Sequence, residues 1–170
     1  FPHGTTSTAA KVAETRQAAA DGASEFDMVV NIGALRSGFD DVVRDDIRAV
    51  VEAAGGAVTK VILEVSLLDD EQIERGSRLA EEAGADFVKT STGFAGGGAT
   101  VETVSLMRRT VGPDTQVKAS GGVRSLQDAI AMLDAGATRL GTSGSATILG
   151  ELRRIAAGGT ASGAVDESSY

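Results

Sequence analysis

The feature that most constrains the fold is a repeated exit from a helix into a short apolar segment. Three segments share a small-residue turn: Asp21-Gly22-Ala23, Ala83-Gly84-Ala85 and Ala135-Gly136-Ala137. Glycine suits the left-handed conformation that caps the C-terminal end of a helix. Because a short apolar run follows each turn, the sequence predicts helices and strands in strict alternation, which is typical of a parallel sheet.

Five strands are expected, at residues 25–31, 60–65, 86–90, 116–119 and 138–142. The helices are expected at residues 8–20, 40–54, 70–83, 101–111, 125–135 and 146–157. We also interpret Phe1-Pro2 as the end of a strand that enters a loop. The crossovers should be right-handed. A (β/α)8 barrel and an open doubly wound sheet both satisfy this order, but the nucleotide-binding glycine motifs of the open folds are absent from the sequence.

A closed barrel has eight strands and typically about 250 residues, whereas this chain has 170. We therefore expect residues 1–157 to form the C-terminal portion of one barrel, with about five to six βα units. Residues 158–170, rich in Gly, Ser and Ala, should form a flexible tail. The remaining N-terminal strands would come from another chain, lie outside this sequence or have been cleaved. Without them, exposed strand edges should make the chain prone to aggregation.

Composition excludes several classes of function. The net charge of −8 argues against nucleic acid or an anionic membrane as a partner. No apolar run is long enough to span a membrane, and no secretory signal is present, so the cytoplasm is the expected location. The chain has no cysteine and a single histidine, His3. These counts exclude thiolate catalysis and argue against a zinc site, and we expect neither a metal nor a cofactor.

The lysines point to amine chemistry. The chain has twelve arginines but only four lysines, and Lys60, Lys89 and Lys118 lie in expected strands at intervals of 29 residues. That interval is one βα unit, so the three should lie at similar heights on neighbouring strands, about 4.8 Å apart. Two ammonium groups at that separation favour the neutral form of one of them, and a neutral lysine amine is the nucleophile that forms a Schiff base.

Side-chain alternation brings carboxylates to the same face. Asp27, Glu64, Lys89 and Lys118 should converge inside the barrel, an arrangement suited to proton transfer. Lys60 begins its expected strand, so pairing with Asp27 or Glu64 could be its entire function. Both Lys60 and Glu64 are therefore assigned supporting roles.

Three loops that follow strands are rich in small residues and suit a phosphate group. They are Thr90-Ser91-Thr92-Gly93, Ser120-Gly121-Gly122 and Thr142-Ser143-Gly144-Ser145. Backbone N–H groups in such loops approach an anion closely, and the N-terminus of the next helix adds partial positive charge. In barrels the loops after the last two strands often bind phosphate. Here those loops contain Gly121, Gly122, Ser143 and Gly144, which are the expected contacts, and Arg124 is a further candidate.

Two longer runs resemble the signatures of deoxyribose-phosphate aldolases, a class I aldolase family. They are Ala85-Asp86-Phe87-Val88-Lys89-Thr90-Ser91-Thr92-Gly93-Phe94 and Val117-Lys118-Ala119-Ser120-Gly121-Gly122-Val123-Arg124. Phe1-Pro2-His3-Gly4 and the runs at residues 25–31 and 60–64 are also similar to the family, as is the terminal Ser168-Ser169-Tyr170. The resemblance extends over about residues 1 to 152.

The resemblance implies a (β/α)8 barrel that reversibly cleaves 2-deoxy-D-ribose 5-phosphate to D-glyceraldehyde 3-phosphate and acetaldehyde without a metal. It implies that Lys89 forms the imine and that Lys118 is the second lysine, which favours the neutral amine of the first. Asp27 would handle protons through water, and Tyr170 would assist proton transfer at the acetaldehyde-derived carbon. The phosphate would bind to the glycine-rich loops, at Gly93, Gly121, Gly122, Ser143 and Gly144. A homodimer is expected by resemblance alone.

Three alternatives remain open on the residues alone. The first is another class I sugar-phosphate aldolase, such as a transaldolase-like barrel. The second is a phosphate-binding barrel isomerase in which the lysines act only electrostatically. The third is an inactive fragment of the barrel.

Overall fold

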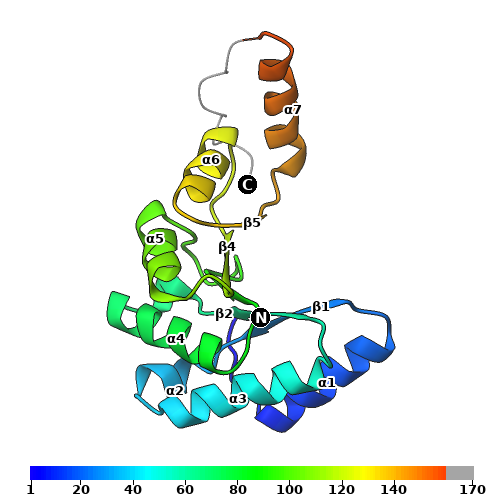
Figure 1. Cartoon of the computed structure of the whole chain (residues 1–170), viewed down its shortest axis with the longest axis vertical. Coiled ribbons are helices and arrows are strands. Elements are labelled where there is room, and N and C mark those ends of the chain that lie inside the picture. Colours follow the sequence, from blue (N-terminus) through cyan, green and yellow to red (C-terminus); the bar gives the residue numbers. More distant parts are fainter. Residues whose placement is uncertain (160–170) are drawn as a thin grey trace.

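The computed structural model describes residues 1–159, which form one parallel sheet lined on one side by helices (Figure 1). The strands are β1 (Glu25–Val29), β2 (Val58–Ile62), β3 (Phe87–Lys89), β4 (Gln116–Ser120) and β5 (Arg139–Gly141). The helices are α1 (Thr8–Ala20), α2 (Ile32–Arg36), α3 (Asp40–Ala53), α4 (Asp70–Glu82), α5 (Val101–Thr110), α6 (Leu126–Asp134) and α7 (Ser145–Ala156), with a 3-10 turn η1 (Val65–Leu67).

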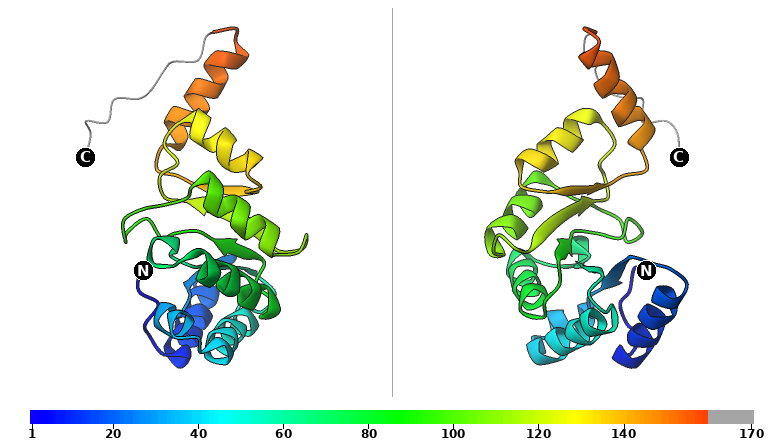
Figure 2. Two further views of the ribbon diagram at one scale, coloured as in Figure 1. Left: turned by 90° about the vertical axis from the view of Figure 1, so that its left-hand side faces the viewer. Right: turned by 45° about the vertical axis from the view of Figure 1, so that its right-hand side comes forward.

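The order of the strands decides between the two folds that the sequence allows. The sheet runs β1-β2-β3-β4-β5, so each strand pairs with the next one along the chain and no crossover reverses the order. A doubly wound sheet would reverse its order at a switch point. Successive helices from α3 to α7 contact one another in the same sequence, and Figure 2 shows the strands fanning progressively from β1 to β5. The architecture is therefore part of a (β/α)8 barrel, as the sequence predicts.

The core lies between the sheet and the helices. Alternate strand residues face the helix layer, and Val61, Val88 and Val117 are completely buried there. Leu63, just beyond β2, is buried with them. Gly76 of α4 permits close packing, because a Cβ atom there would lie 2.9 Å from Leu35 and 3.1 Å from Leu63. The opposite residues of each strand are left facing the interior of the barrel, where the charged side chains gather.

The predicted helices agree with the structure to within a residue or two at their ends, and the strands differ more. The strand expected at residues 60–65 runs instead from Val58 to Ile62, so Lys60 lies at its centre rather than at its start. Glu64 lies beyond the strand in a left-handed conformation with φ 57°. Phe1 and Pro2 belong to no strand. The short helix α2 and the turn η1 were not predicted, because each is too short to show helical periodicity.

The expected tail lies mostly outside the described residues. Residues 160–170, including Tyr170, lie outside the described residues. The prediction of a flexible tail is therefore not tested for them. None of the helices within residues 1–159 is long and apolar enough to cross a membrane.

Candidate active site

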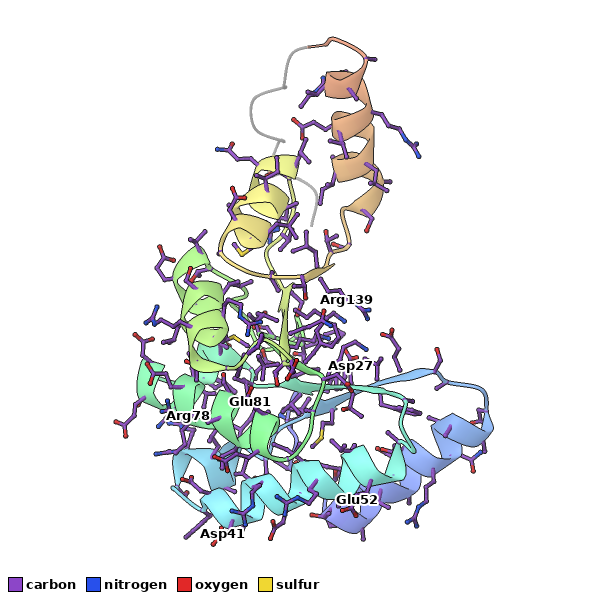
Figure 3. The ribbon with its side chains drawn as sticks, in the orientation of Figure 1. Asp27, Asp41, Glu52, Arg78, Glu81 and Arg139 are labelled. Atoms are coloured by element: carbon purple, nitrogen blue, oxygen red, sulfur yellow. The ribbon has the colours of Figure 1, made fainter. Side chains whose placement is uncertain are left out.

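Asp27 is the centre of a charged cluster inside the sheet. Its carboxylate accepts hydrogen bonds from the Nζ atoms of Lys89 at 2.8 Å and Lys118 at 3.2 Å, both through Oδ2. The other oxygen, Oδ1, lies 3.0 Å from Nζ of Lys60. The structure therefore brings Asp27 together with all three lysines of the 29-residue repeat. In Figure 3 the Asp27 label lies on the side of the strands away from the outer helices.

The sheet register explains why two of the lysines act as a pair. Lys89 lies directly opposite Lys118 in the β3–β4 ladder, so these two are at one height, as their spacing predicts. Lys60 lies opposite Phe87, and Lys89 lies opposite Ile62. Lys60 is therefore two residues nearer the N-terminal end of the strands than Lys89, and the expectation of similar heights was wrong for this residue. Lys60 instead lies directly opposite Asp27 in the β1–β2 ladder, and it contacts Oδ1 of the carboxylate whereas Lys89 contacts Oδ2.

The carboxylate lies between the two amines. Oδ2 of Asp27 is in hydrogen-bond contact with both Lys89 and Lys118. Burial by itself raises the pKa of Asp27, but the hydrogen bonds from Lys89 and Lys60 outweigh it and lower the pKa to about 2. Asp27 is therefore ionised at neutral pH.

Lys118 has a perturbed proton affinity. Burial and then the positive charge of Lys89 lower the pKa of Lys118 from its ordinary value, although the Asp27 carboxylate opposes them. A lysine with a lowered pKa donates its proton more readily than an exposed one, so Lys118 is suited to act as an acid beside Lys89.

Glu64 does not join this cluster. It is completely buried, and its carboxylate accepts hydrogen bonds from the backbone N–H and the hydroxyl of Thr92. Because Thr92 lies three residues after Lys89, Glu64 holds the loop that follows the lysine. The expectation that Glu64 converges on Asp27 failed because strand alternation ends at Ile62, before Glu64 is reached.

Lys89 and Lys118 open into a cavity of about 620 Å³. Its other lining residues come mainly from the loops after β3, β4 and β5: Thr92, Gly93, Phe94, Ser120, Gly121, Gly122, Val123, Arg124, Gly141, Thr142 and Ser143. Three cations line this cavity and none of its lining residues is acidic. In a chain of net charge −8, that local balance favours an anionic ligand.

The helix termini at the cavity differ in their capping. At α6 the side chains of Ser125 and Asp128 form a capping box, so the backbone N–H groups of these two residues are already paired. At α7 the cap residue is Gly144, and no side chain caps the helix. An uncapped helix N-terminus beside Ser143 suits an anion. The N–H of Gly144 itself donates to the Thr142 hydroxyl at 2.9 Å, so of the expected phosphate contacts it has the weakest support.

Backbone contact joins the loops after β3 and β4. The N–H of Ala99 donates to the carbonyl of Gly121 at 2.9 Å. A Cβ atom on Gly98 would lie 2.3 Å from that carbonyl oxygen, so only glycine fits there. Gly121 itself adopts φ 83°, a left-handed conformation that favours glycine. The two loops are thus held together at the rim of the cavity.

Glu25 and Arg139 are two site residues that were not predicted from the sequence. Nζ of Lys60 lies 2.6 Å from Oε2 of Glu25, and Nη1 of Arg139 lies 2.5 Å from the same oxygen. Glu25 shares a face with Asp27 by alternation, and Arg139 lies opposite Lys118 in the β4–β5 ladder. The alternation of Glu25 with Asp27 could have indicated Glu25 from the sequence, whereas the ladder position of Arg139 required the strand register. Phe1 is a further neighbour, with its ring centroid 5.7 Å from Nζ of Lys89.

This chain is similar to known proteins over most of its length. Residues 1–162 match the model of the DeoC/LacD family aldolases. Deoxyribose-phosphate aldolase 1 of Oceanobacillus iheyensis is 61% identical over 153 residues, which cover 89% of this chain and 69% of that protein. The deoxyribose-phosphate aldolase of Streptococcus sanguinis is 59% identical over 149 residues, covering 88% of this chain and 68% of the relative.

Two solved structures are similar in both fold and sequence. One, assigned as a deoxyribose-phosphate aldolase from Coccidioides immitis, gives a TM-score of 0.88 at 49% identity and covers 90% of this chain and 62% of its own. The other, a deoxyribose phosphate aldolase from Aeropyrum pernix described as tetrameric, gives 0.82 at 35% identity and covers 91% of this chain and 66% of its own. The chain spans about two thirds of the length of these relatives.

Proposed function

Because the chain belongs to the DeoC/LacD family of aldolases, we propose that it carries the catalytic centre of a Schiff-base aldolase. The reaction is the reversible cleavage of 2-deoxy-D-ribose 5-phosphate to D-glyceraldehyde 3-phosphate and acetaldehyde. One observation carries the proposal: Lys89 and Lys118 share one oxygen of Asp27 at the mouth of a cavity lined by cations and glycine-rich loops.

The reaction can be written as a series of steps that begins at Lys89. The neutral amine of Lys89 attacks the aldehyde carbon of the open-chain sugar, and loss of water gives the imine. Deprotonation of the sugar 3-hydroxyl breaks the C2–C3 bond and releases the phosphorylated aldehyde. The electron pair of that bond remains on the enzyme-bound two-carbon unit as an enamine. Protonation at its terminal carbon and hydrolysis then release acetaldehyde and free Lys89.

The charges in the cluster divide the proton-transfer roles. Asp27 stays ionised, so it accepts hydrogen bonds and receives protons through water. Lys118 has the lowered pKa of a better acid, which suits it to return protons to the imine and the enamine. Lys60 and Glu64 contact neither cavity nor substrate in this scheme and support Asp27 and the Thr92 loop respectively. Tyr170 is proposed to assist protonation at the acetaldehyde-derived carbon, and it lies outside the described residues.

The phosphate is proposed to bind where the glycine-rich loops meet the uncapped start of α7. Gly93, Gly121, Gly122 and Ser143 line that end of the cavity, with Arg124 as an additional cation. The N–H of Gly144 is already paired with Thr142, so Gly144 would favour phosphate binding only through its position at the uncapped N-terminus of α7. A homo-oligomer, in the simplest case a dimer, completes the proposal. It is supported only by the oligomeric description of a relative.

Trapping the imine tests this function directly. The complete protein is incubated with 2-deoxy-D-ribose 5-phosphate and borohydride, and the modified peptide is mapped by mass spectrometry. The adduct should form on Lys89 and disappear in Lys89→Leu. An adduct on Lys118 or Lys60 would overturn the assignment of roles, and no adduct would overturn the Schiff-base mechanism. Product analysis with acetaldehyde as donor separates this substrate from those of other class I aldolases.

A further inference from the structure

A chain of four ion pairs crosses the interior of the sheet from its last strand to the catalytic cluster. Arg139 on β5 pairs with Glu25 on β1, Glu25 pairs with Lys60 on β2, and Lys60 pairs with Asp27. Asp27 then pairs with Lys89. The first pair joins residues 114 positions apart in the sequence. Figure 3 shows Asp27 and Arg139 near one another, away from the helices that carry Asp41, Glu52 and Arg78.

We propose that Arg139, Glu25 and Lys60 are positioning residues that fix the Asp27 carboxylate in the orientation needed by Lys89 and Lys118. This inference rests on the proposed aldolase function and extends it to three residues that do not line the cavity. Its basis is the division of the two carboxylate oxygens: Oδ1 faces Lys60, and Oδ2 is left for the two amines of the site.

Lys60 can hold this orientation because it has little freedom of its own. Its side chain is only 2% exposed, and its ammonium lies between two carboxylates at 2.6 and 3.0 Å. A buried ammonium is costly unless it is paired. Any rotation of Asp27 that withdrew Oδ1 would therefore leave Lys60 with one partner fewer. A carboxylate tied at one oxygen keeps the other in a fixed direction.

Glu25 and Arg139 anchor the outer end of this series of ion pairs. Glu25 is 39% exposed and would be mobile by itself, but it contacts both Lys60 and Arg139. The Arg139 guanidinium lies 4.8 Å from the centre of the Phe87 ring, which is almost fully buried. Stacking of this kind restrains a guanidinium. Phe87 also precedes Lys89 by two residues on the same strand face, so the anchor and the reactive amine share one strand.

The charged groups that face Asp27 come from every strand. Lys60, Lys89 and Lys118 contact it directly from β2, β3 and β4, while Glu25 and Arg139 act through Lys60. A second cavity, of about 500 Å³, is lined by Asp27 together with the titratable residues His3, Lys11, Glu14 and Glu25. In the inner cluster four cations face two carboxylates, so the loss of one cation raises the affinity of Asp27 for a proton.

The test compares Lys60→Met with Lys11→Met in the complete protein. Lys11 is a matched control, because it is also a buried lysine, 8% exposed, and pairs with one carboxylate, that of Asp46, at 2.5 Å. It joins α1 to α3 and donates to the carbonyl of Val29 on β1 at 3.1 Å, but its ion pair is with Asp46 and not with the catalytic cluster. Lys60→Met should lower kcat about ten- to a hundredfold, as expected for a misplaced catalytic group, and leave KM within about twofold. In the pH profile of Lys60→Met, the fall of kcat at low pH (the acid limb) should move to higher pH. Lys11→Met should change the stability of the protein and leave kcat and its pH profile unchanged.

Glu25→Gln separates positioning from simple electrostatics. Removing this negative charge should, by charge alone, hold the pKa of Asp27 down further. If Glu25 positions Lys60, kcat should nevertheless fall about three- to tenfold, with no upward shift of the acid limb. This residue is partly exposed, so the variant keeps the test available if Lys60→Met does not fold. Lys60→Arg, which keeps the charge and the donors, should recover part of the lost kcat.

Two results would overturn the inference. One is wild-type kcat with an unmoved acid limb in Lys60→Met, and the other is wild-type kcat in Glu25→Gln. Both are distinct from failure of the proposed function, which would show as the absence of a borohydride-trapped adduct in the wild-type protein itself.

Discussion

The low pKa of Asp27 leads to a quantitative prediction for stability. Its folded pKa of about 2 lies below the ordinary value of 3.8, a difference equivalent to about 2.4 kcal/mol. The side chain is 21% exposed, so screening reduces the contribution to roughly 2 kcal/mol. Because the pKa is depressed, this stability is fully present above about pH 3.8 and is lost as the pH falls towards 2.

The perturbation is Asp27→Asn, measured in the complete protein by urea unfolding at several pH values. The variant should be less stable than the wild type by at least roughly 2 kcal/mol at pH 7, because its three lysines also lose their shared counter-charge. The difference should be the same at about pH 5, since Asp27 is still ionised there. Asp41→Asn is the control: Asp41 pairs with Arg44 at 2.8 Å but is 85% exposed, so its effect should stay below about 1 kcal/mol.

A direct titration would refute the reasoning most clearly. The carboxyl carbon of Asp27 can be followed by NMR, and its midpoint should lie well below 3.8. A midpoint at or above that value would show that burial, not the lysines, dominates at this carboxylate. A stability difference that shrank between about pH 7 and pH 5 would lead to the same conclusion.

Four further outcomes are expected. Lys118→Leu should leave Lys89 able to form the trapped imine but lower kcat about a hundredfold, the scale of a general acid, as single-turnover kinetics would show. Glu64→Gln should weaken the hydrogen bonds to Thr92 and raise KM for the phosphorylated sugar up to about tenfold, while a KM equal to that of the wild type would remove Glu64 from the site. Tyr170→Phe should slow proton exchange at the acetaldehyde carbon, followed by NMR in heavy water, without preventing imine formation. The chain expressed by itself should aggregate through its strand edges, and a single cooperative melt of a monomer would contradict this.

The order of helices and strands and the pairing of Lys89 with Lys118 could be predicted from the sequence, because both depend on the spacing of residues. Lys89 and Lys118 are one βα unit apart and share one ladder position, so counting residues was sufficient. Lys60 was misplaced because the stagger between β2 and β3 is a property of barrel closure and not of spacing. The ion pair between Glu25 and Arg139 depends on the curvature of the whole sheet, which no local pattern contains.

The position of Glu64 illustrates a different limit. Its alternation with Lys60 and Ile62 predicted an inward side chain, but the backbone turns into a left-handed conformation at Glu64 itself. A non-glycine residue rarely adopts this conformation. Here two hydrogen bonds from Thr92 accompany it, and these partners lie 28 residues away. A tertiary contact of that range overrides the local preference and is not visible in the sequence.

The backbone contact between Gly98 and Gly121 limits how this site can be altered. The two loops touch without side chains, so any library that introduces a side chain at position 98 forces the Gly121 loop away from the cavity. Single-site changes there would fail for reasons unrelated to substrate preference. Grafting one loop from a homologue would also fail unless the other came with it. For an engineer, the two loops are one exchangeable part, and diversity is better placed at Phe94, whose side chain is 75% exposed at the rim of the cavity.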